Sequence, residues 1–143
     1  IPVPGATGSA TSNIGGKVAA AVEALGTYDF VLLNIKGADE AGHDGKAEEK
    51  RDFISRLDTA VAPLANLPGC LLVVCADHST PCTVKDHSAD PVPLVIAGEV
   101  VRVDSVGRFD EISCAEGGLT RIRGKSLMPV ILDLINKSHK YGA

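Results

Sequence analysis

The sequence predicts an α/β fold in which a mostly parallel sheet is flanked by helices. Three apolar runs of strand length occur, at residues 29–35, 70–76 and 93–97. Such uninterrupted runs are typical of strands that are covered on both faces, as in parallel sheets. Segments with helical spacing of apolar residues alternate with these runs, and this alternation favours a parallel arrangement.

Three segments are predicted to be helical. Residues 14–25 are rich in alanine, keep apolar residues three and four apart, and are followed by Gly26. Residues 46–64 have the same apolar spacing among charged residues and end before Pro68. A last helix is expected at residues 126–135. Helix formers at this spacing, closed by glycine or proline, indicate amphipathic helices.

The remaining segments are predicted to be loops. The first twelve residues are rich in Pro, Gly, Thr and Ser, and we expect a linker or an active-site loop there. A chain that opens in this way without a methionine is expected to be a piece of a longer protein. The polar segment KGADEAGHDG and residues 109–114 are also expected to be loops.

Composition excludes several classes of protein. The 143 residues are 45% apolar and 22% charged, which predicts one globular domain. A net charge of −4 and the lack of tryptophan and of any basic run argue against a nucleic-acid partner. No apolar run approaches the roughly 20 residues that a membrane span needs. Nothing at the start resembles a signal peptide, so we expect a cytoplasmic protein whose four cysteines are free thiols.

Acidic residues and histidines follow the first two predicted strands. Asp39 and His43 come after the first strand, Asp77 and His78 come directly after the second, and His87 lies close behind. Because the carboxyl ends of parallel strands meet at one edge of a sheet, we expect these five side chains to gather there.

The spacing of these residues is typical of metal ligands. Asp39 and His43 are four apart, which places both on one face of a helical turn and within reach of one cation. Asp77 and His78 are adjacent, and at a strand end they would point to opposite sides, toward two different ions. His87 could serve either ion. Single Asp and His residues are usually only solvated, but their joint placement favours a two-metal site for phosphoryl transfer, suited to Zn, Mn or Fe.

Other polar residues near these segments have competing interpretations. Lys36 and Lys85 flank the two segments and could bind phosphate, although solvated lysines fit equally well. Three acidic residues could orient the imidazoles, although surface acidity fits the second better: Asp44, Glu40 and Asp86. Three hydroxyls could act as nucleophiles, but bonds to the loop backbone fit them better: Ser79, Thr80 and Ser88.

The motifs KGADEAGHDG and ADHSTPCTVKDHSADPVP resemble the archaeal-type cofactor-independent phosphoglycerate mutases of the alkaline phosphatase superfamily. The segments GATGSATSN, FDEISCAEGGLTRIRGKSLMPVILDLI and the terminal KYGA are similar to the same family. The resemblance covers nearly the whole chain. It implies that residues 1–143 form the C-terminal segment of a phosphatase-like metal-binding domain, without the N-terminal nucleophile region and the inserted substrate domain.

The resemblance also implies a ligand set. Asp39, His43 and His87 would hold one divalent ion and Asp77 and His78 a second, with Mn or Zn as the expected metals. The second ion would also take an aspartate and a nucleophilic Ser or Thr from the missing region, so this chain supplies no nucleophile and would be inactive alone.

The family reaction is an intramolecular phosphoryl transfer. It interconverts 3-phosphoglycerate and 2-phosphoglycerate in glycolysis and gluconeogenesis without 2,3-bisphosphoglycerate. The expected partners are therefore a phosphoglycerate substrate and the remainder of the enzyme.

Two alternatives share these ligands. Another member of the superfamily, a phosphopentomutase or a phosphatase, would use the same ligand set with a different substrate. A non-catalytic module would instead use the Asp/His cluster as a closed structural metal site, with all its ligands in this chain.

Overall fold

The computed structural model describes residues 1–139, so the terminal KYGA lies outside the described residues. The chain divides into two compact units. Unit 1 comprises Ile1–Leu67 and Ser79–Ala89, and unit 2 comprises Pro68–His78 and Asp90–Ala143. Each unit is described by itself below.

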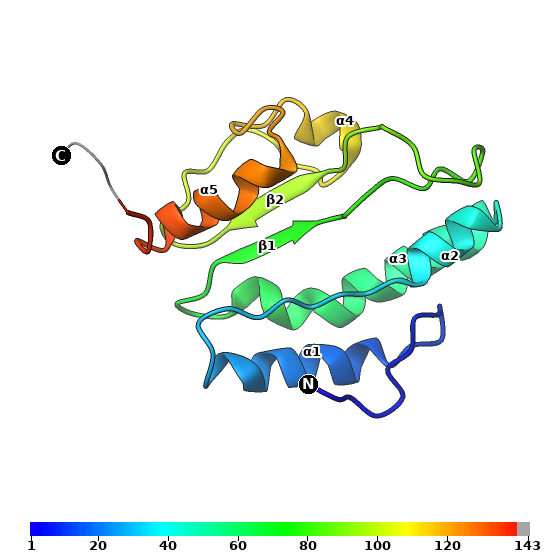
Figure 1. Ribbon diagram of the computed structural model, residues 1–143, viewed down its shortest axis with the longest axis horizontal. Helices are drawn as coiled ribbons and strands as arrows, with labels where there is room; N and C mark the ends of the chain where they lie inside the picture. The colour runs from blue at the N-terminus through cyan, green and yellow to red at the C-terminus, as the bar shows by residue number, and fades with distance from the viewer. Residues whose placement is uncertain (140–143) are drawn as a thin grey trace. The chain divides into compact units, whose positions relative to one another are not determined.

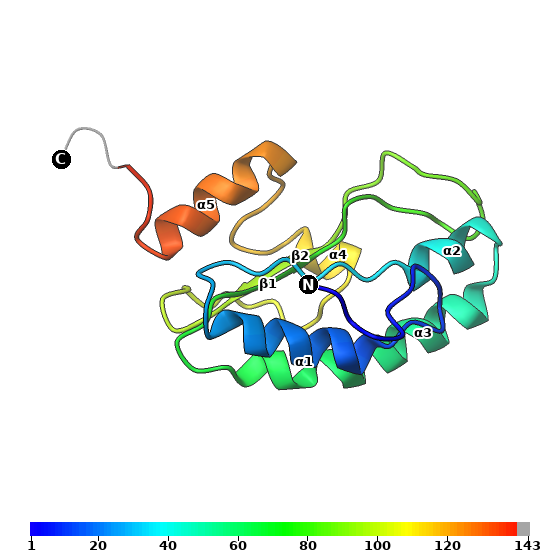
Figure 2. The same ribbon diagram turned by 60° about the horizontal axis from the view of Figure 1, so that its bottom comes forward.

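Unit 1 is helical. It contains α1 (Ile14–Leu25), α2 (Gly37–His43), α3 (Ala47–Val61) and the 3-10 helix η1 (Ala62–Asn66). The helices predicted at residues 14–25 and 46–64 are thereby confirmed. α1 and α3 lie side by side, and α2 lies against one end of α3 (Figure 1, Figure 2).

The core of unit 1 is centred on Phe53. Its side chain is 1% exposed and packs with Ile14 and Val18 of α1. A Cβ on Gly37 would lie 2.5 Å from Cε2 of Phe53, closer than carbon atoms can approach. The glycine therefore lets the start of α2 approach the core, which fixes the position of the helix that follows.

The strand predicted at residues 29–35 is wrong, because this segment has no strand structure among the described residues. Its burial nevertheless alternates. Leu33 and Ile35 pack against the core of unit 1, whereas Phe30 is 55% and Leu32 79% exposed. A strand requires backbone hydrogen bonds to a neighbour as well as an apolar sequence, and the apolar run reports only the second property.

Unit 2 contains a two-stranded sheet. β1 (Leu72–Cys75) pairs with β2 (Leu94–Ala97), with Leu72 opposite Ala97 and Cys75 opposite Leu94. The predicted strands at residues 70–76 and 93–97 are confirmed, both over fewer residues. The pairing is antiparallel, so the prediction of a mostly parallel sheet is wrong for the described residues. Apolar runs carry no information on strand direction, and both directions accept half-buried Val and Leu.

The rest of unit 2 is mainly loop with three short helical segments, α4 (Glu111–Cys114), η2 (Gly124–Ser126) and α5 (Leu127–Leu134). α5 confirms the predicted last helix, whereas residues 109–114 were expected to be a loop. A helix of four residues is too short to show apolar periodicity.

Within the described part of the chain, no helix is both long and apolar enough to cross a membrane.

We predict that Phe53→Ala lowers the free energy of unfolding by about 3–5 kcal/mol, because it removes the most buried side chain of unit 1. Ile54→Ala is the matched control: Ile54 is 48% exposed, so its loss should cost less than about 1 kcal/mol. Urea unfolding of the full-length protein measures both values. Equal losses for the two variants would contradict the placement of the core at Phe53.

A second prediction concerns Asp110, which caps α4. Hydrogen bonds from the Ser113 backbone and hydroxyl, with that from the Ile112 N–H, hold the pKa of the Asp110 carboxyl below its ordinary value. A lowered folded-state pKa stabilises the fold above the unfolded pKa of about 4, and this contribution is lost as the pH falls through the folded value. Wild type should therefore exceed Asp110→Asn in stability at pH 7 but not at pH 2. A difference that persists at pH 2 would contradict this cap.

Candidate metal centre

Helix α2 places Asp39 and His43 one turn apart on the same face. The segment was expected to be a loop, but the spacing of four residues correctly indicated a helical turn. The helix ends at His43, and Gly45 follows with φ of +72°, a left-handed conformation that suits glycine. Nε2 of His43 lies 3.5 Å from Oδ1 of Asp39.

The second part of unit 1, Ser79–Ala89, brings His87 to the same place. The backbone of Ser79 and Ser88 forms a bridge, with the Ser88 N–H donating to the Ser79 carbonyl at 3.0 Å. Between them, the Val84 and Lys85 N–H groups both donate to the Pro81 carbonyl. The chain thus reverses direction between Ser79 and Ser88, and His87 lies on the returning segment.

Three ligand atoms converge within unit 1. Nε2 of His43 lies 3.3 Å from Nε2 of His87, and Nε2 of His87 lies 3.8 Å from Oδ1 of Asp39. Around a tetrahedral zinc ion with bonds of about 2.0–2.1 Å, ligand atoms are about 3.3–3.4 Å apart. The triangle therefore has nearly the dimensions that a single divalent cation requires.

The electrostatics of this triangle favour a cation. Nδ1 of His43 lies 3.2 Å from the Lys85 carbonyl, which can only accept, so in the neutral ring Nδ1 carries the hydrogen and Nε2 the lone pair. That lone pair faces His87 and the carboxylate of Asp39. A cation between them would contact all three atoms at once. One carboxylate and two imidazoles match the preferences of Zn, Mn and Fe.

Asp39 is also tied to the segment that carries His87. The hydroxyl of Thr80 donates to Oδ1 of Asp39 at 2.6 Å, and Nζ of Lys50 donates to the Thr80 carbonyl at 2.7 Å. A Cβ on Gly42 would lie 2.5 Å from that carbonyl oxygen, so the glycine lets α2 approach Thr80. The Thr80 hydroxyl, which was expected to bond the loop backbone, donates to the Asp39 carboxylate.

The three acidic residues considered as partners of the imidazoles have other contacts. Asp44 pairs with Lys46 at 3.1 Å, and this hydrogen bond raises the pKa of the Lys46 ammonium. Glu40 accepts a hydrogen bond from the Ala10 backbone N–H at 3.2 Å. Asp86 accepts from the backbone N–H of His87 at 2.7 Å. A backbone carbonyl, that of Lys85, orients the ring of His43 instead, and sequence contains no signal for such a contact.

Asp77 and His78 lie in unit 2, two residues after β1 ends at Cys75. Nε2 of His78 is 3.6 Å from Oδ2 of Asp77, and the His78 N–H donates to Oδ1 of Asp77 at 3.2 Å. The two side chains approach one another, in contrast to the opposite orientation expected at a strand end, because the strand has already ended. Burial raises the pKa of the Cys75 thiol, and the negative charge of Asp77 raises it further by a smaller amount.

The backbone groups of Lys36 and Lys85 form hydrogen bonds with the residues of this cluster. The Lys36 carbonyl accepts from the Asp39 N–H at 3.1 Å at the start of α2. Lys85 has φ of +60°, a left-handed conformation that is uncommon for a residue with a side chain. Its carbonyl bonds His43, so this backbone conformation helps to orient the ring. Phosphate binding by either ammonium group stays a prediction.

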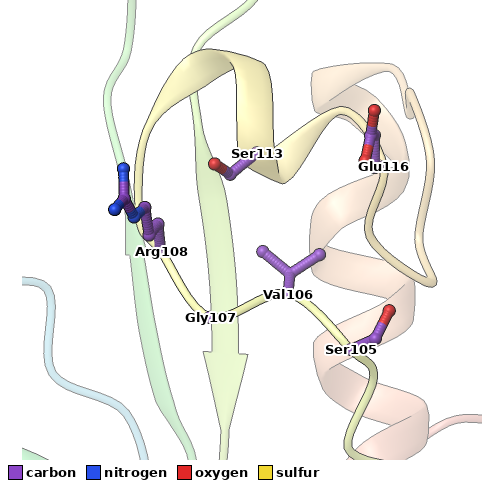
Figure 3. A pocket seen from close by; sticks show the side chains of 6 residues that line it. All are labelled: Ser105, Val106, Gly107, Arg108, Ser113 and Glu116. Carbon is purple, nitrogen blue, oxygen red and sulfur yellow. The ribbon is translucent and has the colours of Figure 1, made fainter.

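Unit 2 has a cavity of about 420 Å³ of its own. Figure 3 shows that Arg108 and Glu116 lie on opposite sides of it, with Val106 and Ser113 between them. The cavity thus combines both signs of charge and contains no cluster of imidazoles or carboxylates. Within unit 1, by contrast, Asp39, His43 and His87 lie close together.

Comparison with known families identifies the class of protein. The model of the metalloenzyme superfamily matches residues 1–134 of the chain. The chain therefore belongs to the metalloenzyme superfamily, in agreement with the Asp/His cluster of unit 1.

Its relatives within this superfamily are archaeal 2,3-bisphosphoglycerate-independent phosphoglycerate mutases. The chain is 70% identical over its full length to the enzyme of that name from Methanoculleus marisnigri, of which it covers 35%. It is 61% identical over 99% of its length to that of Methanosphaerula palustris, of which it covers 34%. A solved structure of a Pyrococcus horikoshii protein is 45% identical, with a TM-score of 0.95 over 99% of this chain and 44% of that one. The chain spans about a third of the length of the curated relatives it matches.

We predict that Gly42→Ala destabilises unit 1 by about 1–3 kcal/mol and shifts the ¹⁵N resonances of His43 and His87, because the added methyl displaces Thr80. Gly15→Ala is the matched control in α1, where a Cβ meets nothing within 4 Å. That variant should be neutral or stabilising by less than about 1 kcal/mol. Unchanged histidine resonances in Gly42→Ala would show that α2 does not rest on Thr80.

Proposed function

We propose that the full-length protein is a phosphoglycerate mutase that interconverts 3-phosphoglycerate and 2-phosphoglycerate independently of 2,3-bisphosphoglycerate. The observation that carries the proposal is the convergence of Asp39, His43 and His87 in a chain 70% identical to a relative of that name. The chain would form the C-terminal part of the metal-binding domain of a cytoplasmic enzyme.

We infer that Asp39, His43 and His87 hold one divalent ion, Mn or Zn. The distances among their ligand atoms and the tautomer of His43 support this assignment. Asp77 and His78 would hold a second ion together with an aspartate and a nucleophilic Ser or Thr from elsewhere in the enzyme. In the sequence, Asp77 and His78 directly precede Ser79, the residue at which unit 1 resumes.

Such ions supply positive charge, which lowers the pKa of a bound hydroxyl and neutralises phosphoryl oxygens. The residues of this chain would hold the ions and orient the ligand side chains. The Lys85 carbonyl keeps the hydrogen of His43 on Nδ1, so that Nε2 is available as a ligand. Lys36 and Lys85 lie next to the ligand-bearing segments along the chain, and their ammonium groups would counter the charge of the phosphoglycerate.

The proposal is tested by assaying the full-length protein with 3-phosphoglycerate and following the formation of 2-phosphoglycerate without added 2,3-bisphosphoglycerate. Activity should disappear after dialysis against a chelator and return with Mn or Zn. Phosphopentose isomerisation or hydrolysis of simple phosphate esters without mutase activity would favour a phosphopentomutase or a phosphatase and overturn the proposal. Tight metal binding without any turnover would favour a structural site.

For the metal assignment, we predict that His43→Ala and His87→Ala each weaken the binding of Mn to the full-length protein by more than about 100-fold. Removing residues that only orient a ligand already costs about 10–100-fold in metal affinity. His139→Ala is the control, because His139 is exposed and lies in unit 2. Calorimetric titration measures the affinities. Wild-type affinity in His43→Ala would exclude His43 as a ligand.

A further inference from the structure

Thr80 is the one buried polar residue in the described part of the chain, with 4% of its surface exposed. Its hydroxyl donates to Oδ1 of Asp39 at 2.6 Å, across a separation of 41 residues. Bonds of this length from a hydroxyl to a carboxylate are charge-assisted and about twice as strong as neutral ones. The contact joins the helix that carries Asp39 and His43 to the segment that carries His87.

We propose that Thr80 is a positioning residue, which sets the rotation of the Asp39 carboxylate and thereby the metal affinity of the centre. This inference rests on the metal assignment proposed above. The terminal torsion of an aspartate is broad, so its carboxylate turns freely unless a partner fixes it. Oδ1 has two lone pairs, so an oxygen that accepts the hydrogen bond from Thr80 can also ligate a cation.

The donor itself is held in place from two sides. Nζ of Lys50, on α3, donates to the Thr80 carbonyl at 2.7 Å, and the backbone of Gly42 packs against the same residue. Threonine is branched at Cβ, which restricts its side-chain rotation. The backbone of Thr80 is thus held by two helices of unit 1, while its hydroxyl donates to Asp39.

A threonine that only filled space would have a different signature. Thr80→Val keeps the shape and removes the hydroxyl, so a purely structural role would change stability and leave metal affinity unchanged. A positioning role changes metal affinity, and Thr80→Ser, which retains the hydroxyl, restores it. Thr83 is exposed and lies in the same segment, so Thr83→Val is the matched control.

The test is calorimetric titration of the full-length variants with MnCl₂, together with urea unfolding in a chelator. We expect Thr80→Val to bind Mn about 10–100-fold more weakly than wild type, as is typical for residues that orient a ligand. Thr80→Ser and Thr83→Val should lie within about threefold of wild type. If Thr80→Val fails to fold, Thr80→Ala removes the same hydroxyl without the added methyl.

Wild-type affinity in the hydroxyl-free variant, together with weak binding by His43→Ala, would overturn the positioning role and leave the metal assignment standing. Wild-type Mn affinity in both the hydroxyl-free variant and His43→Ala would overturn the positioning role of Thr80 and the metal assignment together. Mutase activity is measured separately: a wild-type protein that binds Mn and shows the expected Thr80 series but no mutase activity would overturn only the proposed function.

Discussion

The centre depends on an electrostatic constraint within unit 1, where two imidazole nitrogens and a carboxylate oxygen face one another. His43 and His87 approach to 3.3 Å, and the Lys85 carbonyl directs a lone pair of His43 into the gap. In the neutral rings, the N–H of His87 at Nε2 can donate to Nε2 of His43, and a cation bound by both nitrogens would replace that proton. A cation at this position would fit the chain's membership of the metalloenzyme superfamily.

Packing, and not the ligands themselves, maintains this constraint. Gly37 lets α2 approach the buried ring of Phe53, and Gly42 lets the same helix approach Thr80. Each contact is too close for any other side chain, so the position of α2 is fixed at both of its ends. Because α2 carries two of the three proposed ligands, Asp39 and His43, the hydrophobic core of unit 1 positions them.

Sequence predicted the features that local spacing encodes. The two long helices of unit 1 and the shared face of Asp39 and His43 follow from periods of three and four residues. Features that depend on contacts between distant parts of the chain were missed or wrongly predicted. The direction of β1 and β2 and the fate of residues 29–35 depend on which backbone pairs with which. The hydrogen bond from Thr80 to Asp39 joins residues that are far apart in the sequence, so no local sequence pattern predicts it.

The most direct test of this account is to collect X-ray data at the Mn absorption edge from crystals of the full-length protein soaked in MnCl₂, and to locate the anomalous peaks. The account predicts a peak within about 2.0–2.3 Å of Oδ1 of Asp39 and Nε2 of His43 and His87, because those atoms already form a triangle of the required size. Peaks confined to other residues, with the two imidazoles hydrogen-bonded to each other, would contradict it.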